Sequence, residues 1–272
     1  MNRLIRISIS STALLLPLAS AAGQHGGHPD HAAHVAADPV AAAVASPSRT
    51  PANVARDAYR HPVETLRFFG VTPQQTVVEF APSGGWYTEI LAPLLKEKGS
   101  LIALQPSGRY LDRYKSFLAA KPAAYAKVKL VAFPEQAATI PAGSVDTVLT
   151  FRNVHNLVMS GAEAAAFKAF FDLLKPGGTL GIVDHRLPES RDAALEKSSG
   201  YLKTSSVRRI AEAAGFEYVG SSEINANAKD SADWPKGVWT LPPTLSNGET
   251  DKAKYLAIGE SDRMTLKFRK PG

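Results

Sequence analysis

The sequence predicts an α/β protein built on a doubly wound, mostly parallel β-sheet. Short segments of β-branched and aliphatic residues alternate along the chain with longer segments in which apolar residues recur at helical spacing. Clusters of Gly, Pro and Ser separate these segments and mark turns. Such alternation is typical of βαβ units with right-handed crossovers, which place helices on both faces of a parallel sheet.

Each element follows from its local pattern. Residues 76–80 (TVVEF) are mostly β-branched and apolar, and residues 86–96 have helical spacing after a turn of small residues. The KPGG run at 175–178 ends one helix and leads into the next strand. In chain order the sequence predicts a helical segment at 54–69 that Pro62 starts or kinks, then strand 76–80, helix 86–96, strand 101–104, helix 110–120, strands 127–132 and 145–150, helix 162–174, strand 179–184, helix 204–214 and strands 218–224 and 263–269.

The first 22 residues have the pattern of a secretory signal peptide. Two arginines precede a mostly apolar stretch at residues 7–18, and small residues follow it. We expect cleavage near Ala21 or Ala22 and a periplasmic or secreted mature protein. No later apolar run reaches the length of a membrane helix, so we expect no integral membrane segment after cleavage.

The rest of the chain divides by composition into an arm and a domain. Residues 23–50 are rich in Ala, Pro, His, Gly and Ser and have few large apolar side chains, which predicts a flexible arm. Residues 51–272 have the length of one α/β domain. Within it, residues 225–262 form a long connection with two tryptophans, which we interpret as an ordered flap.

Composition excludes several classes of function. The chain has no cysteine, which excludes disulfides, thiolate metal sites and a nucleophilic Cys. Its formal charge of +6 falls to +4 without the leader, which carries two arginines and no acid. That excess is small and the basic residues are scattered along the chain, so we expect a small-molecule partner and no nucleic acid.

The junction at residues 76–91 is the best candidate for a cofactor site. A strand, a tight loop of small residues and a helix follow one another there. Backbone N–H groups and the positive end of the helix can face a ligand, and Glu79 at the end of the strand can bind hydroxyl groups or a cation.

Several motifs resemble those of class I S-adenosylmethionine (SAM)-dependent methyltransferases. The first is the LLKPGGTL run at 173–180, which precedes the fifth strand. The GGWYTE run at 84–89, the RNVHN run at 152–156 and the closing LKFRKP at 266–271 are similar to an exported, predicted-methyltransferase branch of that family. The resemblance covers about residues 54–271. It implies a Rossmann-like fold with an antiparallel C-terminal strand, and SAM as cofactor.

The family's first motif is an acidic residue followed by alternating glycines. The resemblance implies that Glu79 is the acid and that Ala81, Ser83 and Gly85 occupy the three glycine positions, of which only the last is Gly. Cβ atoms at the first two positions narrow the approach to a cofactor. Gly84 restores flexibility one residue later.

Two further cofactor residues follow from the same resemblance. Gln105 matches the position after the second strand where the family places an acid on the ribose hydroxyls, and Gln136 matches the position near adenine N6. A neutral amide accepts a hydrogen bond without the charge that strengthens it.

Polar residues after the fourth and fifth strands predict the catalytic site. Asn153 and His155 stand two residues apart and point to one side if the chain stays extended. His185 and the preceding Asp184 follow the fifth strand, which neighbours the fourth, so we expect the two histidines to share a pocket. His155 would act as general base and Arg152 would position an acidic substrate group. Alternatively, the histidine caps a loop and the arginine pairs with a helix carboxylate.

Two metal sites are also conceivable. His155, His185 and Asp184 are suitable ligands for zinc or iron. The arm carries four histidines spaced by three, and these would bind a divalent metal loosely, unless the arm only keeps the chain soluble. The four are His25, His28, His31 and His34.

Two functional interpretations stay open at this level. One is a periplasmic SAM-dependent methyltransferase-like enzyme acting on a small acceptor. The other is a catalytically inactive protein of the same fold that binds a small molecule or metal. The fold does not decide between them.

Overall fold

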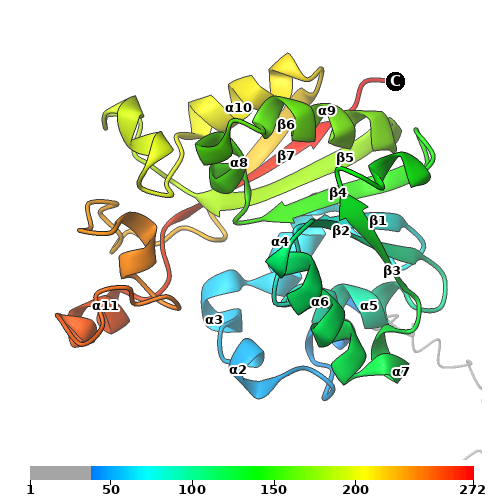
Figure 1. Ribbon diagram of the computed structural model, residues 1–272, viewed down its shortest axis with the longest axis horizontal. Helices are drawn as coiled ribbons and strands as arrows, with labels where there is room; N and C mark the ends of the chain where they lie inside the picture. The colour runs from blue at the N-terminus through cyan, green and yellow to red at the C-terminus, as the bar shows by residue number, and fades with distance from the viewer. Residues whose placement is uncertain (1–37) are drawn as a thin grey trace, which may run out of the picture. The chain divides into compact units, whose positions relative to one another are not determined.

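Seven strands form a single sheet at the centre of the computed structural model, which describes residues 38–272 (Figure 1). The sheet order is β3-β2-β1-β4-β5-β7-β6. Strands β1 to β5 run parallel, and β7 is antiparallel to both of its neighbours. This confirms the predicted mostly parallel sheet with an antiparallel C-terminal strand. The strands are β1 (Thr76–Phe80), β2 (Ser100–Pro106), β3 (Val128–Phe133), β4 (Val145–Phe151), β5 (Leu174–His185), β6 (Glu217–Ser222) and β7 (Arg263–Arg269).

Eleven α-helices accompany the sheet within residues 38–272. Figure 1 shows α8, α9 and α10 over one face of the sheet and α4, α5 and α6 over the other. The helices are α1 (Pro39–Val44), α2 (Pro51–Val54), α3 (Asp57–Arg60), α4 (Pro62–Phe69), α5 (Thr88–Leu95), α6 (Arg109–Ala120), α7 (Pro122–Tyr125), α8 (Val154–Ser160), α9 (Glu163–Leu173), α10 (Thr204–Ala213) and α11 (Lys252–Ile258).

Two apolar cores lie on the two faces of the sheet, because successive side chains of a strand point to opposite sides. From β1, Val78 and Phe80 enter the core under α9 and α10, whereas Val77 enters the core under α4 and α5. Pairing β1 between β2 and β4 buries it on both faces, as expected for a parallel sheet. The carboxyl ends of β1, β2 and β4 therefore meet at one fixed edge.

The C-terminal part of the predicted flexible arm, which was expected to end at residue 50, contains a helix. Residues 39–44 form α1, which Asp38 caps through a 2.9 Å bond from the Val40 N–H. Val40 and Ala43 are buried against α4 and α5. Small apolar side chains sufficed for this helix because they pack on an existing core, which composition alone does not reveal. The predicted signal peptide and the four histidines of the arm lie outside the described residues.

The connection at 225–262 is ordered and contains elements that the sequence did not predict. A 3-10 helix (Gly237–Thr240) and α11 lie within it. The Asp230 carboxylate accepts bonds from Tyr201 OH (2.9 Å), Trp234 Nε1 (2.6 Å) and the Asp262 N–H (2.8 Å). One buried carboxylate thus ties both ends of the connection to the residues after β5. Within residues 38–272 no helix has the length and hydropathy needed to cross a bilayer.

Candidate functional site

The loop after β1 keeps a glycine-type backbone although two of its glycine positions carry side chains. Ala81 has φ of 51°, Ser83 has φ of 52° and Gly85 has φ of 75°. Residues with a Cβ rarely adopt this left-handed conformation, which costs on the order of 1 kcal/mol each. The loop therefore follows a left-handed path at every second residue whatever the side chain.

The two glycines of this loop have different surroundings. A Cβ on Gly85 would lie 2.3 Å from the Phe117 ring of α6, so this glycine allows α6 to pack against the loop. A Cβ on Gly84 would meet nothing within 4 Å. The open backbone surface of the loop is thus at Gly84, one residue before the matched position.

Glu79 is buried at the end of β1. It is 2 % exposed, and its Oε2 accepts a 2.6 Å bond from Thr88 Oγ1, which also lies 3.0 Å from Tyr114 OH. Burial raises the pKa of Glu79 to about 7, and the Thr88 hydroxyl only partly offsets that rise. A buried acid without a cationic partner is suited to receive a cation.

The two glutamines assigned to the cofactor both bond to backbone. Gln105 is buried at the end of β2, and its Oε1 accepts a 3.0 Å bond from the Ser83 N–H, which holds the loop after β1 against β2. Gln136 is exposed after β3, and its Oε1 accepts a bond from the Ala132 N–H. Gln105 therefore lies against the predicted cofactor loop, and Gln136 lies at the exposed end of the adjacent strand β3.

Asn153 and His155 do not point to one side, because the chain turns into α8 at Val154 rather than staying extended. The Asn153 amide donates to the carbonyls of Phe80 and Phe151, both at 3.1 Å, and so joins the ends of β1 and β4. His155 points instead toward β5. The expectation failed because an asparagine before a helix takes a cap-like position that spacing alone does not indicate.

His155 and Asp184 form an oriented pair. Asp184 is fully buried, and its carboxylate accepts the backbone N–H groups of His155 (3.0 Å) and His185 (2.8 Å). Its Oδ1 also lies 2.8 Å from His155 Nδ1. Because a carboxylate only accepts, Nδ1 carries the proton, which leaves a lone pair on Nε2 in the neutral ring. Nε2 makes no hydrogen bond within residues 38–272.

His185 shares the pocket with His155, as the strand order predicts. The two rings are 5.0 Å apart. Arg152 Nε lies 3.4 Å from His185 Nε2, and the Ser261 hydroxyl lies 2.5 Å from Nδ1, so both ring nitrogens are engaged. Burial, together with the nearby Arg152 guanidinium, holds the pKa of His185 well below its usual range. This histidine is therefore neutral.

His155, Asp184 and His185 also present three potential metal ligands within 4.8 Å of one another. The Arg152 guanidinium beside His185, however, repels a cation. The Asp184 carboxylate already accepts three hydrogen bonds. This arrangement fits an oriented base better than a metal centre.

Sequence reasoning missed a group of arginines at the same edge. Arg56 precedes α3, Arg60 ends it, and Arg263 begins β7. All three contact the buried carboxylate of Glu260, at 2.6, 3.3 and 3.1 Å. Arg152 lies beside them, and burial, with part of the effect offset by Glu260, lowers its pKa to about 10. The cluster joins three stretches that lie far apart in sequence, around residues 56–60, 152 and 260–263, and no local spacing signals the contact between these stretches.

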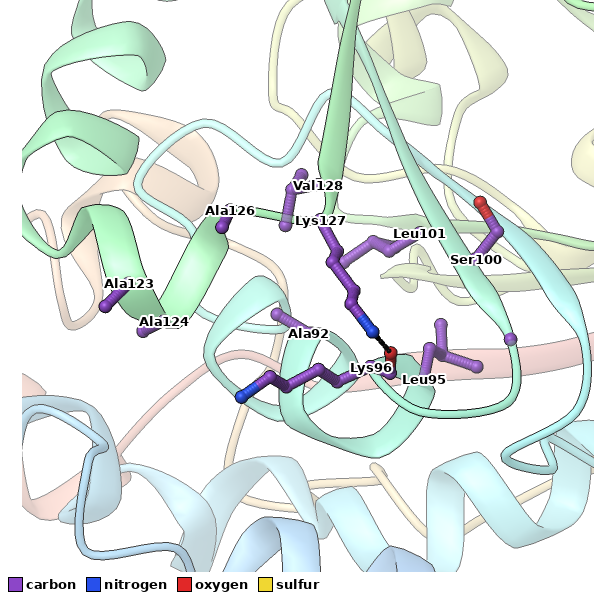
Figure 2. A pocket seen from close by; sticks show the side chains of 11 residues that line it. Ala92, Leu95, Lys96, Ser100, Leu101, Ala123, Ala124, Ala126, Lys127 and Val128 are labelled. Carbon is purple, nitrogen blue, oxygen red and sulfur yellow. Dashed lines mark hydrogen bonds between the residues drawn. The ribbon is translucent and has the colours of Figure 1, made fainter.

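One cavity lies near His155, and a second lies away from the site. One of about 460 Å³ lies under the connection and is lined by Trp239, whose ring is 6.3 Å from that of His155. A smaller cavity of about 80 Å³ lies at the amino ends of β2 and β3, on the opposite edge of the sheet. Figure 2 shows its mostly aliphatic lining, with Lys96, Ser100 and Lys127 as the polar residues, and the bond from Lys127 Nζ to the Lys96 carbonyl, which measures 2.7 Å. It contains no acid or imidazole, so we interpret it as a packing void.

Fold and sheet order define this chain as having the class I SAM-dependent methyltransferase fold. No protein-family model matches the sequence, and no curated protein matches it. Solved structures do match its fold. A SAM-dependent methyltransferase from Aquifex aeolicus superposes with a TM-score of 0.55 at 16% identity, covering 79% of this chain and 92% of that one.

Two other similar structures show how varied this fold is in function. Phosphoethanolamine N-methyltransferase 2 of Haemonchus contortus, in complex with SAM, has a TM-score of 0.51 and 16% identity, covering 79% of this chain and 53% of that one. The cyclase SpnF has a TM-score of 0.51 and 15% identity, covering 79% and 81%. At these identities the likeness establishes the fold and leaves the activity to the site.

Proposed function

We propose that this protein binds SAM at the carboxyl edge of β1 and β2 and transfers its methyl group to a small acceptor. The observation that carries the proposal is the backbone of the loop after β1. Ala81, Ser83 and Gly85 all hold the left-handed conformation that alternating glycines supply in the matched motif. Two residues with side chains bear the cost of this conformation, which indicates that the shape of the loop is needed.

The residues around the loop fit a cationic ligand. Glu79 supplies a buried carboxylate with no cationic partner among the described residues. Gly84 leaves the backbone open to a ligand. The Gln105 amide, which holds the Ser83 N–H, is placed to exchange that bond for a ribose hydroxyl.

His155 would accept the acceptor's proton. SAM supplies a methyl group on a sulfonium, from which it can pass to a nucleophilic N or O. His155 Nε2 would take the proton from that atom, because Asp184 fixes the tautomer that leaves Nε2 unprotonated. Positioning supplies most of the remaining rate enhancement.

Calorimetric titration of the mature chain with SAM and with its demethylated product tests the proposal. We expect saturable binding of both, and weaker SAM binding in Glu79→Gln, which keeps the shape of the side chain and removes its charge. A Glu97→Gln variant, at an exposed position after α5, is the matched control. If neither ligand binds at millimolar concentration, the proposal is lost.

A binding protein without methyl transfer is the second candidate function. The Ser83–Gln105 bond closes the loop onto β2, and the Phe117 ring packs on Gly85, so the site is held together without a ligand. Binding of the demethylated product with no turnover on any acceptor would favour this candidate.

The location we propose is the periplasm or the exterior of the cell, on the strength of the leader pattern at residues 1–22. A mass measurement on protein recovered from the periplasmic fraction tests it. We expect a chain that begins near residue 22 or 23, and a full-length cytoplasmic chain would contradict the proposal.

A further inference from the structure

Four guanidinium groups gather around one carboxylate at the carboxyl edge of the sheet. Arg56, Arg60 and Arg263 contact Glu260, and Arg152 lies beside them without an ion pair among the described residues. We call these four arginines and the glutamate the arginine cluster. Glu260, Arg60 and Arg263 are each no more than 5 % exposed. One carboxylate cannot neutralise four cations in a largely buried cluster. Asp184 attracts Arg152 and Asp262 attracts Arg263, but neither forms an ion pair with the cluster, and Asp262 is paired with Arg186.

The hydrogen bonding of the arginine cluster is also incomplete. Arg60 Nη2 and Arg56 Nη2 are buried and have no hydrogen-bond partner among the described residues. A buried donor of this kind is costly, and a charged one more so. Burial and the proximity of Arg152 hold the pKa of Arg60 well below its usual range, while Glu260 only partly compensates. The unsatisfied N–H donors and the excess of positive charge both favour the binding of an anion.

The position of the cluster relates it to the cofactor loop. The Arg60 guanidinium lies over the ring of Trp86, the residue directly after Gly85, at 4.6 Å. The Tyr87 ring stacks at 3.5 Å on Phe151, the residue directly before Arg152. An anion held by the cluster would therefore lie beside the loop where SAM is proposed and beside the His185 ring.

We propose that the arginine cluster binds the oxyanion group, carboxylate or phosphate, of a small molecule at this edge of the sheet. Planar guanidinium groups match both oxyanions through paired N–H donors. Naming that molecule as the methyl acceptor rests on the proposed function, whereas oxyanion binding itself does not. The proposed function thus gains a substrate class, namely a small acid or phosphate ester with a methylatable N or O.

Calorimetry on the mature chain without SAM tests the cluster separately from the cofactor site. The probes are inorganic phosphate and succinate, titrated at constant ionic strength held by chloride. We expect saturable binding of at least one, and the tighter one identifies the oxyanion type. Arg152→Gln should weaken it at least tenfold, because Arg152 is the guanidinium not paired with Glu260. The matched control Arg269→Gln, at an exposed ion pair on β7, should change it less than twofold.

A second variant is expected to strengthen oxyanion binding rather than weaken it. Glu260→Gln removes the internal carboxylate that competes for three of the guanidiniums, so we expect the oxyanion to bind more tightly, by about tenfold. A purely structural cluster would give no gain. Failure of both probes to bind, or equal losses in Arg152→Gln and Arg269→Gln, overturns the inference. If Glu260→Gln does not fold, the comparison of the two arginine variants still decides. If the oxyanion binds and SAM does not, the proposed function is refuted, whereas oxyanion binding by the arginine cluster is supported.

Discussion

Replacing Glu79 with Gln tests whether the acid at the end of β1 is buried as an unpaired group. Burial raises its pKa from 4.5 to about 7, so the folded protein holds the proton that the unfolded chain releases earlier. The contribution of Glu79 to the free energy of unfolding is therefore complete below pH 4.5, decreases as the pH rises toward 7, and is lost above that pH. Each unit of pKa is worth about 1.4 kcal/mol, so the total loss is roughly 3 kcal/mol.

The measurement is urea unfolding followed by tryptophan fluorescence, for the wild type and Glu79→Gln, at about pH 5 and about pH 8.5. The amide side chain of the variant does not titrate, so the difference between the two proteins isolates this one group. From pH 5 to pH 8.5, we expect the free energy of unfolding of the variant to rise by about 2 to 3 kcal/mol relative to that of the wild type. Parallel pH profiles for the two proteins would refute the burial argument.

Three further outcomes follow from the site. SAM affinity should rise about tenfold from pH 6 to pH 8, as Glu79 ionises toward the cation, and Glu79→Gln should abolish that rise. Gly85→Ala should lower the free energy of unfolding in urea by about 2 kcal/mol or more, because its Cβ would overlap the Phe117 ring. Gly84→Ala should change it by no more than about 0.5 kcal/mol, and equal losses in the two variants would contradict this reasoning. His155→Gln should lower turnover by about 100-fold and leave SAM binding unchanged, and unchanged turnover would remove it as base.

Most of the fold follows from the sequence because it depends on local patterns. The period of two in the apolar strands and the helical spacing between them act over a few residues, and all seven predicted strands are present. The KPGG run follows the end of α9 as predicted, but β5 begins at Leu174 and includes that run, because Val145 pairs with Leu174. The exceptions are elements whose stability comes from distant contacts. Helix α1 has no large apolar side chain and forms because Val40 and Ala43 pack on α4 and α5. Helix α8 begins at Val154, so the extended conformation under which Asn153 and His155 would point to one side does not occur.

The site was predicted in part for the same reason. His155 and His185 come together because the carboxyl ends of neighbouring strands meet, which topology alone dictates. The arginine cluster could not be predicted this way. Arg56, Arg152 and Arg263 occupy three separate elements or their flanks, and basic residues scattered along a chain suggested a diffuse charge. Their meeting depends on how α3 and the end of the 225–262 connection pack over the sheet, which no local pattern encodes.

Left-handed backbone conformations occur at both proposed binding sites. Arg152 has φ of 63°, the same unfavourable left-handed region that Ala81 and Ser83 occupy. It is held there by a 2.7 Å bond from its N–H to the Val183 carbonyl and by the Asn153 amide that joins β1 to β4. Each such position costs on the order of 1 kcal/mol and persists only where surrounding contacts enforce it. The strained arginine belongs to the arginine cluster and the strained loop directly follows the strand that carries Glu79, so the same β1–β4 junction fixes both. The left-handed conformation also occurs at His61, Ala232, Leu245 and Asp251, so the shared β1–β4 junction, rather than the strain alone, is what supports one preorganised edge for the two proposed ligands.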